Sequence, residues 1–222
     1  MSNGNTLYLE CRSGISGDMT VAALLDLGAD QKVLEDVLES LPVQGFEIKV
    51  SRVTKSGIDA CDFDVILDAE IDGHDHDMEY LHGHDHHHDH GHHHEHCHEH
   101  VHEDGSVHTH GHHHEHRGLH EILHIIEHAD MTERAKETAV RIFQILAEAE
   151  SKAHGVPADQ VHFHEVGAVD SIVDILAVAV CLDNLDITEV IVPFLCEGQG
   201  SIRCQHGIIP VPVPAVVNIA QA

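Results

Sequence analysis

A short stretch of the sequence holds two histidines and three carboxylates that are spaced to act together. In an extended segment His162 and His164 point to the same side, and Glu165 follows directly. Asp170 and Asp174 are spaced i, i+4, so they share one helix face near its start. Imidazoles and carboxylates gathered where a strand meets a helix predict a divalent-metal or proton-transfer site with these five residues as catalytic groups. The alternative is a cap at Asp170 and two surface histidines.

A glycine-rich loop is the second candidate site. The segment Ser13-Gly-Ile-Ser-Gly-Asp18 lies where a strand is expected to pass into a helix. Glycines there allow backbone N–H groups to face an anion, and the helix start adds partial positive charge. We expect a phosphate-bearing ligand on Ser13, Gly14, Ser16, Gly17 and Asp18, with a tight turn and helix cap as the equal alternative. The Walker A pattern of P-loop NTPases occurs nowhere in the chain.

The third candidate is a histidine tract. The chain has 28 His, and 21 of them lie in residues 74–116 beside ten acidic residues and no Lys or Arg. Imidazole binds nickel, zinc, copper and cobalt, and carboxylates can complete the ligand shell. The expected metal ligands are three histidine triplets, together with His162 and His164. The triplets are His86, His87, His88, His92, His93, His94, His112, His113 and His114. An expression tag and a pH-sensitive loop are the alternatives.

Two further groups of residues could bind metal. Cys204 and His206 could be ligands or acid–base groups, although the prolines that follow could simply brace a rigid loop. His120, His124 and His128 share one helical face, where an exposed flank is the favoured alternative to a two-histidine chelate.

Composition excludes several classes of protein. The 222-residue chain has 11 Lys and Arg against 39 Asp and Glu, a formal net charge of −28. So acidic a chain is a poor binder of nucleic acid or of an anionic membrane surface. It contains no apolar run long enough to cross a membrane and no secretory signal at its start. Six cysteines without a Cys-x-x-Cys pair indicate reduced thiols and a cytoplasmic protein.

The pattern of apolar residues indicates the elements that position these candidates. Strands are expected at 6–11, 46–50, 63–67, 161–164 and 190–193. Helices are expected from Asp18 to Gly28, and at 30–40, 119–129, 132–154 and 170–184. Residues 201–213 should be rich in turns. This order predicts an α/β or α+β fold with mixed layers of strands and helices.

The tract should interrupt this fold. Residues 1–71 and 119–222 are expected to form one globular domain, with residues 72–118 a disordered metal-binding insert, because the tract has too few apolar residues to offset the entropy cost of ordering.

Three segments together resemble the signature segments of the LarC family. They are Ser13-Gly-Ile-Ser-Gly-Asp-Met19, the stretch from His162 to Asp174, and His206-Gly-Ile-Ile-Pro-Val-Pro212. The resemblance implies a nickel insertase, a chelatase-type lyase that places Ni(II) in pyridinium-3,5-bisthiocarboxylic acid mononucleotide. It also implies dependence on CTP with Mn or Mg, and a product used by lactate racemase-type apoenzymes. The family often has Asp-x-Phe before the glycine-rich loop, where this chain has Glu10-Cys-Arg12.

The resemblance further implies a C-terminal domain to which nucleotide binding is ascribed, so this chain is expected to be inactive alone and to need that half or a separate polypeptide. A homo-oligomer is also expected. Two other functions stay open: nickel storage or delivery without catalysis, and a metal-dependent hydrolase that uses Asp170, Asp174 and His162.

Overall fold

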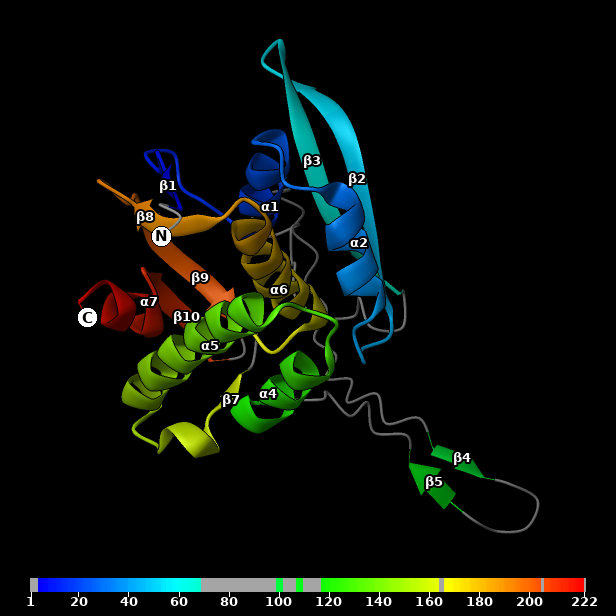
Figure 1. Ribbon diagram of the computed structural model, residues 1–222. Coiled ribbons are helices and arrows are strands. Elements are labelled where there is room, and N and C mark those ends of the chain that lie inside the picture. Colours follow the sequence, from blue (N-terminus) through cyan, green and yellow to red (C-terminus); the bar gives the residue numbers. More distant parts are fainter. Residues whose placement is uncertain are drawn as a thin grey trace, which may run out of the picture. The chain divides into compact units, whose positions relative to one another are not determined.

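Helices and short strands alternate along the chain, which confirms the predicted mixed α and β fold. The computed structural model describes residues 4–68, 99–101, 107–109, 117–163, 166–204 and 206–221 (Figure 1). In chain order the helices are α1 (Gly17–Asp26), α2 (Gln31–Glu39), α4 (Leu119–His128), α5 (Glu133–His154), α6 (Val169–Asn184) and α7 (Pro214–Ala220). The strands are β1 (Asn5–Tyr8), β2 (Phe46–Lys55), β3 (Ile58–Leu67), β4 (Glu99–Val101), β5 (Val107–Thr109), β6 (Arg117–Gly118), β7 (His162–Phe163), β8 (Ile187–Ile191), β9 (Gly200–Cys204) and β10 (Gly207–Val211).

The chain divides into two units, Met1–His74 with His116–Ala222, and Asp75–Glu115. In the second unit the structure describes only β4 and β5, an antiparallel pair in which Val101 lies opposite Val107. These six residues form strands where the sequence led us to expect no regular structure. The rest of the tract, with its nine predicted metal ligands, lies outside the described residues. The domain boundaries at 71 and 119 remain a prediction.

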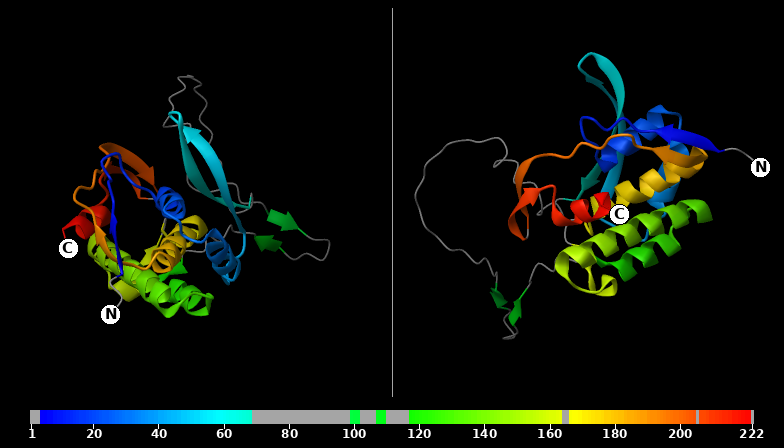
Figure 2. Two further views of the ribbon diagram at one scale, coloured as in Figure 1. Left: turned by 45° about the horizontal axis from the view of Figure 1, so that its top comes forward. Right: turned by 90° about the vertical axis from the view of Figure 1, so that its left-hand side faces the viewer.

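Helix α6 is the central helix of the first unit. It packs against α1, α2, α5 and β3, and Figure 2 shows it between these elements from two further sides. Its sequence is apolar on nearly every face, as expected of a helix surrounded by protein. Ile172, Val173, Leu176 and Ala177 are fully buried. The helix begins at Val169 with Ala168 as N-cap, so of the two predicted starts Asp170 is one residue late and Ser171 is two residues late.

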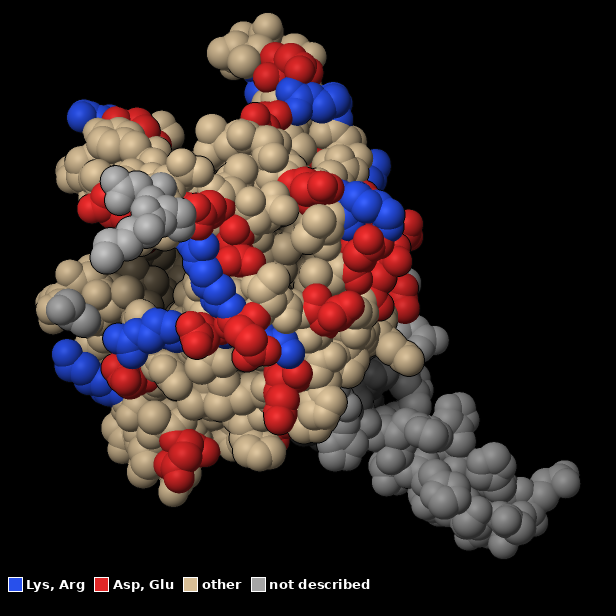
Figure 3. Space-filling view, in the orientation of Figure 1, with Lys and Arg blue, Asp and Glu red and all other residues tan. Residues whose placement is uncertain are grey.

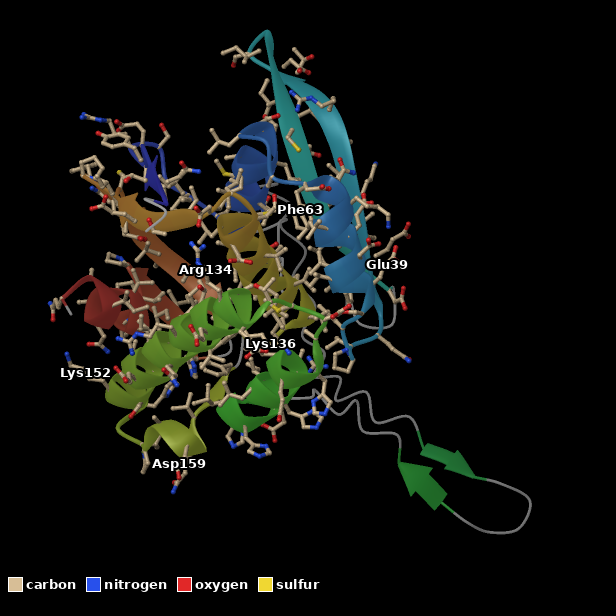
Figure 4. All side chains as sticks on the ribbon, viewed as in Figure 1. Glu39, Phe63, Arg134, Lys136, Lys152 and Asp159 are labelled. Carbon is tan, nitrogen blue, oxygen red and sulfur yellow. The ribbon has the colours of Figure 1, made fainter. Side chains whose placement is uncertain are left out.

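Strand β3 of a long hairpin and helix α5 both pack against α6. Strands β2 and β3 pair along ten residues each. Phe63 on β3 is buried in the hydrophobic core, and β3 packs against α1 (Figure 4). Of the two predicted caps of α5, Asp130 and Thr132, the structure has Thr132, whose hydroxyl accepts from the N–H of Ala135. The helix ends at His154, as predicted, and Gly155 after it is in the left-handed conformation. Phe143 on α5 meets Phe163 edge to face with ring centroids 6.3 Å apart.

The remaining strands form small pairs. Strand β1 runs parallel to β8, and β9 pairs with β10 in an antiparallel hairpin. The turn-rich segment expected at 201–213 is therefore wrong for most of its length. Prolines argue against a central strand, but Pro210 is accepted here because β10 pairs only with β9 among the described residues.

Acidic side chains dominate part of the surface. In the view of Figure 3 they gather over α2, which carries Glu35, Asp36 and Glu39. No helix in the described part of the chain is both long enough and apolar enough to cross a membrane.

Candidate functional site at the starts of helices α1 and α6

Three predicted site carboxylates lie near the starts of two helices. Asp18 lies in the first turn of α1, Asp170 in the first turn of α6 and Asp174 one turn later. The two helices meet at Gly17, where an added Cβ would lie 2.4 Å from Oδ2 of Asp174. Only a residue without a side chain allows so close an approach. The structure therefore joins the glycine-rich loop and the Asp170–Asp174 pair, two candidates far apart in sequence, into one site.

The Asp174 carboxyl has an altered acidity. Burial and, after it, the negative charges of Asp18 and Asp170 together raise its pKa to about 7, against a hydrogen bond from the backbone of Asp18 that lowers it. Its Oδ1 is buried without a hydrogen-bond partner among the described residues. A carboxyl that exchanges its proton near neutral pH is suited to general acid–base chemistry.

The loop before α1 differs in detail from the prediction. The N-cap is Ser16 and not Asp18, and the Ser16 hydroxyl donates to the carboxylate of Asp18 instead of capping the helix. The N–H of Gly14 donates to the carbonyl of Cys11 at 3.2 Å, which closes a turn. Asp174 takes the position that an external anion would occupy at this helix end. Phosphate binding by the loop from Ser13 to Asp18 therefore stays a prediction, with a competing carboxylate already in place.

His162 lies where the tract rejoins the folded unit. Strand β6 pairs with β7 so that Gly118 lies opposite His162, and His162 is exposed while Phe163 is buried. Arg117 Nη1 donates to the carbonyl of Gly167 at 3.2 Å, which holds the β7–α6 connection against β6. His162 is thus beside the chain that emerges from the tract, a position that its place in the sequence does not show.

His164 and Glu165 lie outside the described residues, so their meeting with the carboxylates remains a prediction. In the part of the chain that the structure describes, no three His, Cys, Asp or Glu side chains are arranged to hold a metal ion.

The minor candidates separate into two groups. Both His124 and His128 are exposed on α4, with rings stacked 4.2 Å apart, as the exposed-flank interpretation predicts. The ring of His206 lies 4.9 Å from that of His154, whose Nε2 is 3.3 Å from a carboxylate oxygen of Glu150. The pairing with His154 was not predicted, because α5 and the β9–β10 turn are far apart in sequence. The side chain of Cys204 lies outside the described residues.

Comparison with known proteins gives one consistent result. A sequence model of the family described as "Nickel insertion protein" matches residues 7–222. The chain is 52% identical over 216 residues to the "Pyridinium-3,5-bisthiocarboxylic acid mononucleotide nickel insertion protein" of Alkaliphilus metalliredigens, which covers 97% of this chain and 45% of the relative. Proteins of the same name from Clostridium acetobutylicum and Geobacillus kaustophilus are 46% and 41% identical, over 96% and 97% of this chain and 49% and 44% of their own lengths. The chain thus spans about half of these relatives, and no solved structure matches it.

Proposed function

The chain belongs to the family of nickel insertion proteins, and from that premise we propose that it is the metal-handling part of an enzyme that inserts Ni(II) into pyridinium-3,5-bisthiocarboxylic acid mononucleotide. The observation that carries this proposal is the family match over nearly the whole chain, together with relatives whose printed names specify that substrate. We further propose a chelatase-type lyase that acts in the cytoplasm and passes its product to a lactate racemase-type apoenzyme.

Nickel is the cargo of this reaction, and the chain offers two kinds of group for it. Residues 74–116 supply 21 imidazoles at high local density, which suits the collection of nickel ions. His162 is an exposed imidazole in β7, opposite Gly118, which follows the tract by two residues. We propose that it acts with His164 and Glu165 to pass nickel toward the substrate, pyridinium-3,5-bisthiocarboxylic acid mononucleotide.

Asp174 is proposed to move the protons that accompany metal transfer. Histidine ligands and acidic sulfur ligands bind nickel in their deprotonated forms, so the transfer of nickel exchanges protons with the protein. A carboxyl with a pKa of about 7 can accept and return a proton at neutral pH. Asp18 and Asp170 support this role through their charges, which help to keep the pKa high.

The start of α1 does not fit the triphosphate of CTP. The start of α1 is taken by the Asp174 carboxylate, and Asp18 and Asp170 add negative charge beside it, which repels a triphosphate. We therefore assign no step of a CTP reaction to these residues. We propose that CTP, with Mn or Mg, is bound by the part of the relatives that this chain does not match.

Nickel storage without catalysis is the second candidate function, and the separate histidine-rich unit favours it. A cofactor-formation assay distinguishes the two. It uses a chimera in which this chain replaces the matching region of the Alkaliphilus metalliredigens relative, with CTP and titrated nickel. Formation of the nickel cofactor supports insertion, whereas nickel binding without cofactor at any nickel concentration supports storage.

Two variants assign the groups within this assay. Deletion of residues 74–116 should lower cofactor formation only at scarce nickel, because a reservoir changes supply and not the transition state. His162→Ala with His164→Ala should lower it even with nickel in excess, because more nickel does not replace a ligand lost from the transfer step. The exposed pair His124→Ala with His128→Ala is the matched control and should leave it unchanged. Full activity of the His162/His164 variant at limiting nickel would refute their role.

A further inference from the structure

An apolar run is exposed at the end of β8. Relative exposures are 46% for Val190, 41% for Ile191, 43% for Val192, 54% for Phe194 and 48% for Leu195. Large apolar side chains that are exposed singly are ordinary, but five within six residues are not. The run also continues straight into the exposed segment that leads to β9.

The sequence pattern and the exposure disagree. A near-continuous run of Val, Ile, Phe and Leu is typical of a parallel strand that is covered on both faces. Strand β8 is parallel, but its only neighbour among the described residues is β1, where Tyr8 is 58% exposed. An isolated pair of parallel strands leaves uncovered the surface that such a sequence is built to bury. The pattern therefore indicates that another body covers it.

The exposed run is held in place and is not a frayed end. Leu9 donates its N–H to the carbonyl of Ile191 at 2.9 Å, and Cys196 donates to the carbonyl of Cys11 at 3.3 Å. At the start of β8, Arg134 of α5 donates to a carboxylate oxygen of Asp186 at 2.8 Å (Figure 4). The surface is thus presented on a fixed scaffold, which lowers the entropy cost of binding a partner.

We propose that Tyr8, Val190, Ile191, Val192, Phe194 and Leu195, here called the β8 apolar surface, dock the part of the nickel insertion protein that lies outside this chain. The occupant follows from length, because the matched relatives have more than half of their residues beyond the region this chain covers. The proposal rests on family membership and not on the reaction assigned above. A second copy of the chain is disfavoured, because two chains of net charge −28 repel one another.

Native cysteines provide the test. Cys196 is exposed next to the β8 apolar surface, and Cys61 on β3 is a half-buried free thiol on another element. The rate of maleimide labelling at each is measured by peptide mass spectrometry, in the chain alone and in the chimera that carries the remainder of the Alkaliphilus metalliredigens relative. If the surface is docked, the labelling rate of Cys196 should be at least about tenfold lower in the chimera than in the chain alone, because thiol reactivity follows exposure. The labelling rate of Cys61 should differ by less than about twofold between the two proteins.

Surface variants complete the test. Phe194→Asp and Val192→Asp should restore fast labelling of Cys196 in the chimera, and Ile58→Asp, at the tip of the β2–β3 hairpin, should not. These side chains are exposed, so circular dichroism of the chain alone should be unchanged. Equal labelling of Cys196 in the chain and the chimera overturns the proposal. It is also overturned if Cys196 of the chain alone is protected in proportion to its concentration and sedimentation shows a dimer, because a second copy then covers the surface.

Discussion

Replacing Asp174 with Asn should stabilise the folded chain, and the gain should grow as the pH rises. The carboxyl is partly buried beside Asp18 and Asp170, and its pKa in the folded protein is raised from 3.8 to about 7. Below pH 3.8 both states hold the proton and the substitution changes little. Between 3.8 and about 7 the unfolded chain loses its proton first, so the folded state loses stability. Above about pH 7 the carboxyl is charged in both states, and the folded chain bears the full free-energy cost of a charge at this partly buried position.

The shift sets the size of the gain. At about 1.4 kcal/mol per pKa unit, the rise of the pKa from 3.8 to about 7 corresponds to a loss of about 4 kcal/mol in the unfolding free energy of the unsubstituted chain. Solvent reaches part of the side chain, and screening reduces this to about 2 kcal/mol. We expect Asp174→Asn to add less than about 1 kcal/mol to the unfolding free energy at pH 5 and about 2 kcal/mol at pH 8. The Asn oxygen can still accept the hydrogen bond from the Asp18 backbone.

Urea denaturation followed by circular dichroism from pH 4 to pH 8 measures this difference. Asp159→Asn, which changes an exposed carboxylate in the turn after α5, is the matched control and should stay within about 0.5 kcal/mol of the unsubstituted chain at every pH. The reasoning is refuted if the gain from Asp174→Asn is as large at pH 5 as at pH 8, or if the variant is less stable at pH 8. In the cofactor-formation assay, the same variant should be impaired despite its higher stability, because it cannot exchange a proton.

Two other predictions concern the site and the tract. Gly17→Ala should cost about 1–3 kcal/mol in urea denaturation, because its Cβ would lie 2.4 Å from the Asp174 carboxylate and force α1 and α6 apart; stability equal to that of the unsubstituted chain would contradict the contact. Nickel binding by residues 74–116 should weaken on acidification through about pH 6.5, because protons compete for imidazole; calorimetry that shows the same stoichiometry at pH 5 would count against imidazole ligation.

Much of the local structure followed from the sequence because it depends on nearby residues. For α5 the sequence predicted a cap at Asp130 or Thr132 and an end at His154, and the structure has the cap at Thr132 and the end at His154. The hairpin of β9 and β10 was missed, because prolines suppress strand propensity and only the pairing of two edge strands overrides them. The start of α6 was placed one or two residues late, since an acidic residue in the first turn resembles a cap.

The sequence by itself determined which residues could do chemistry, since the histidine tract, the glycine-rich loop and the Asp170–Asp174 spacing are all local patterns. It also indicated a strand at 190–193. Only the tertiary structure decided that Gly17 meets Asp174, that burial and nearby charges there raise the pKa of a carboxyl to about 7, and that the apolar run at the end of β8 stays uncovered. The reason is that burial and the distance between charges depend on contacts between segments far apart in the chain, and no local pattern encodes them.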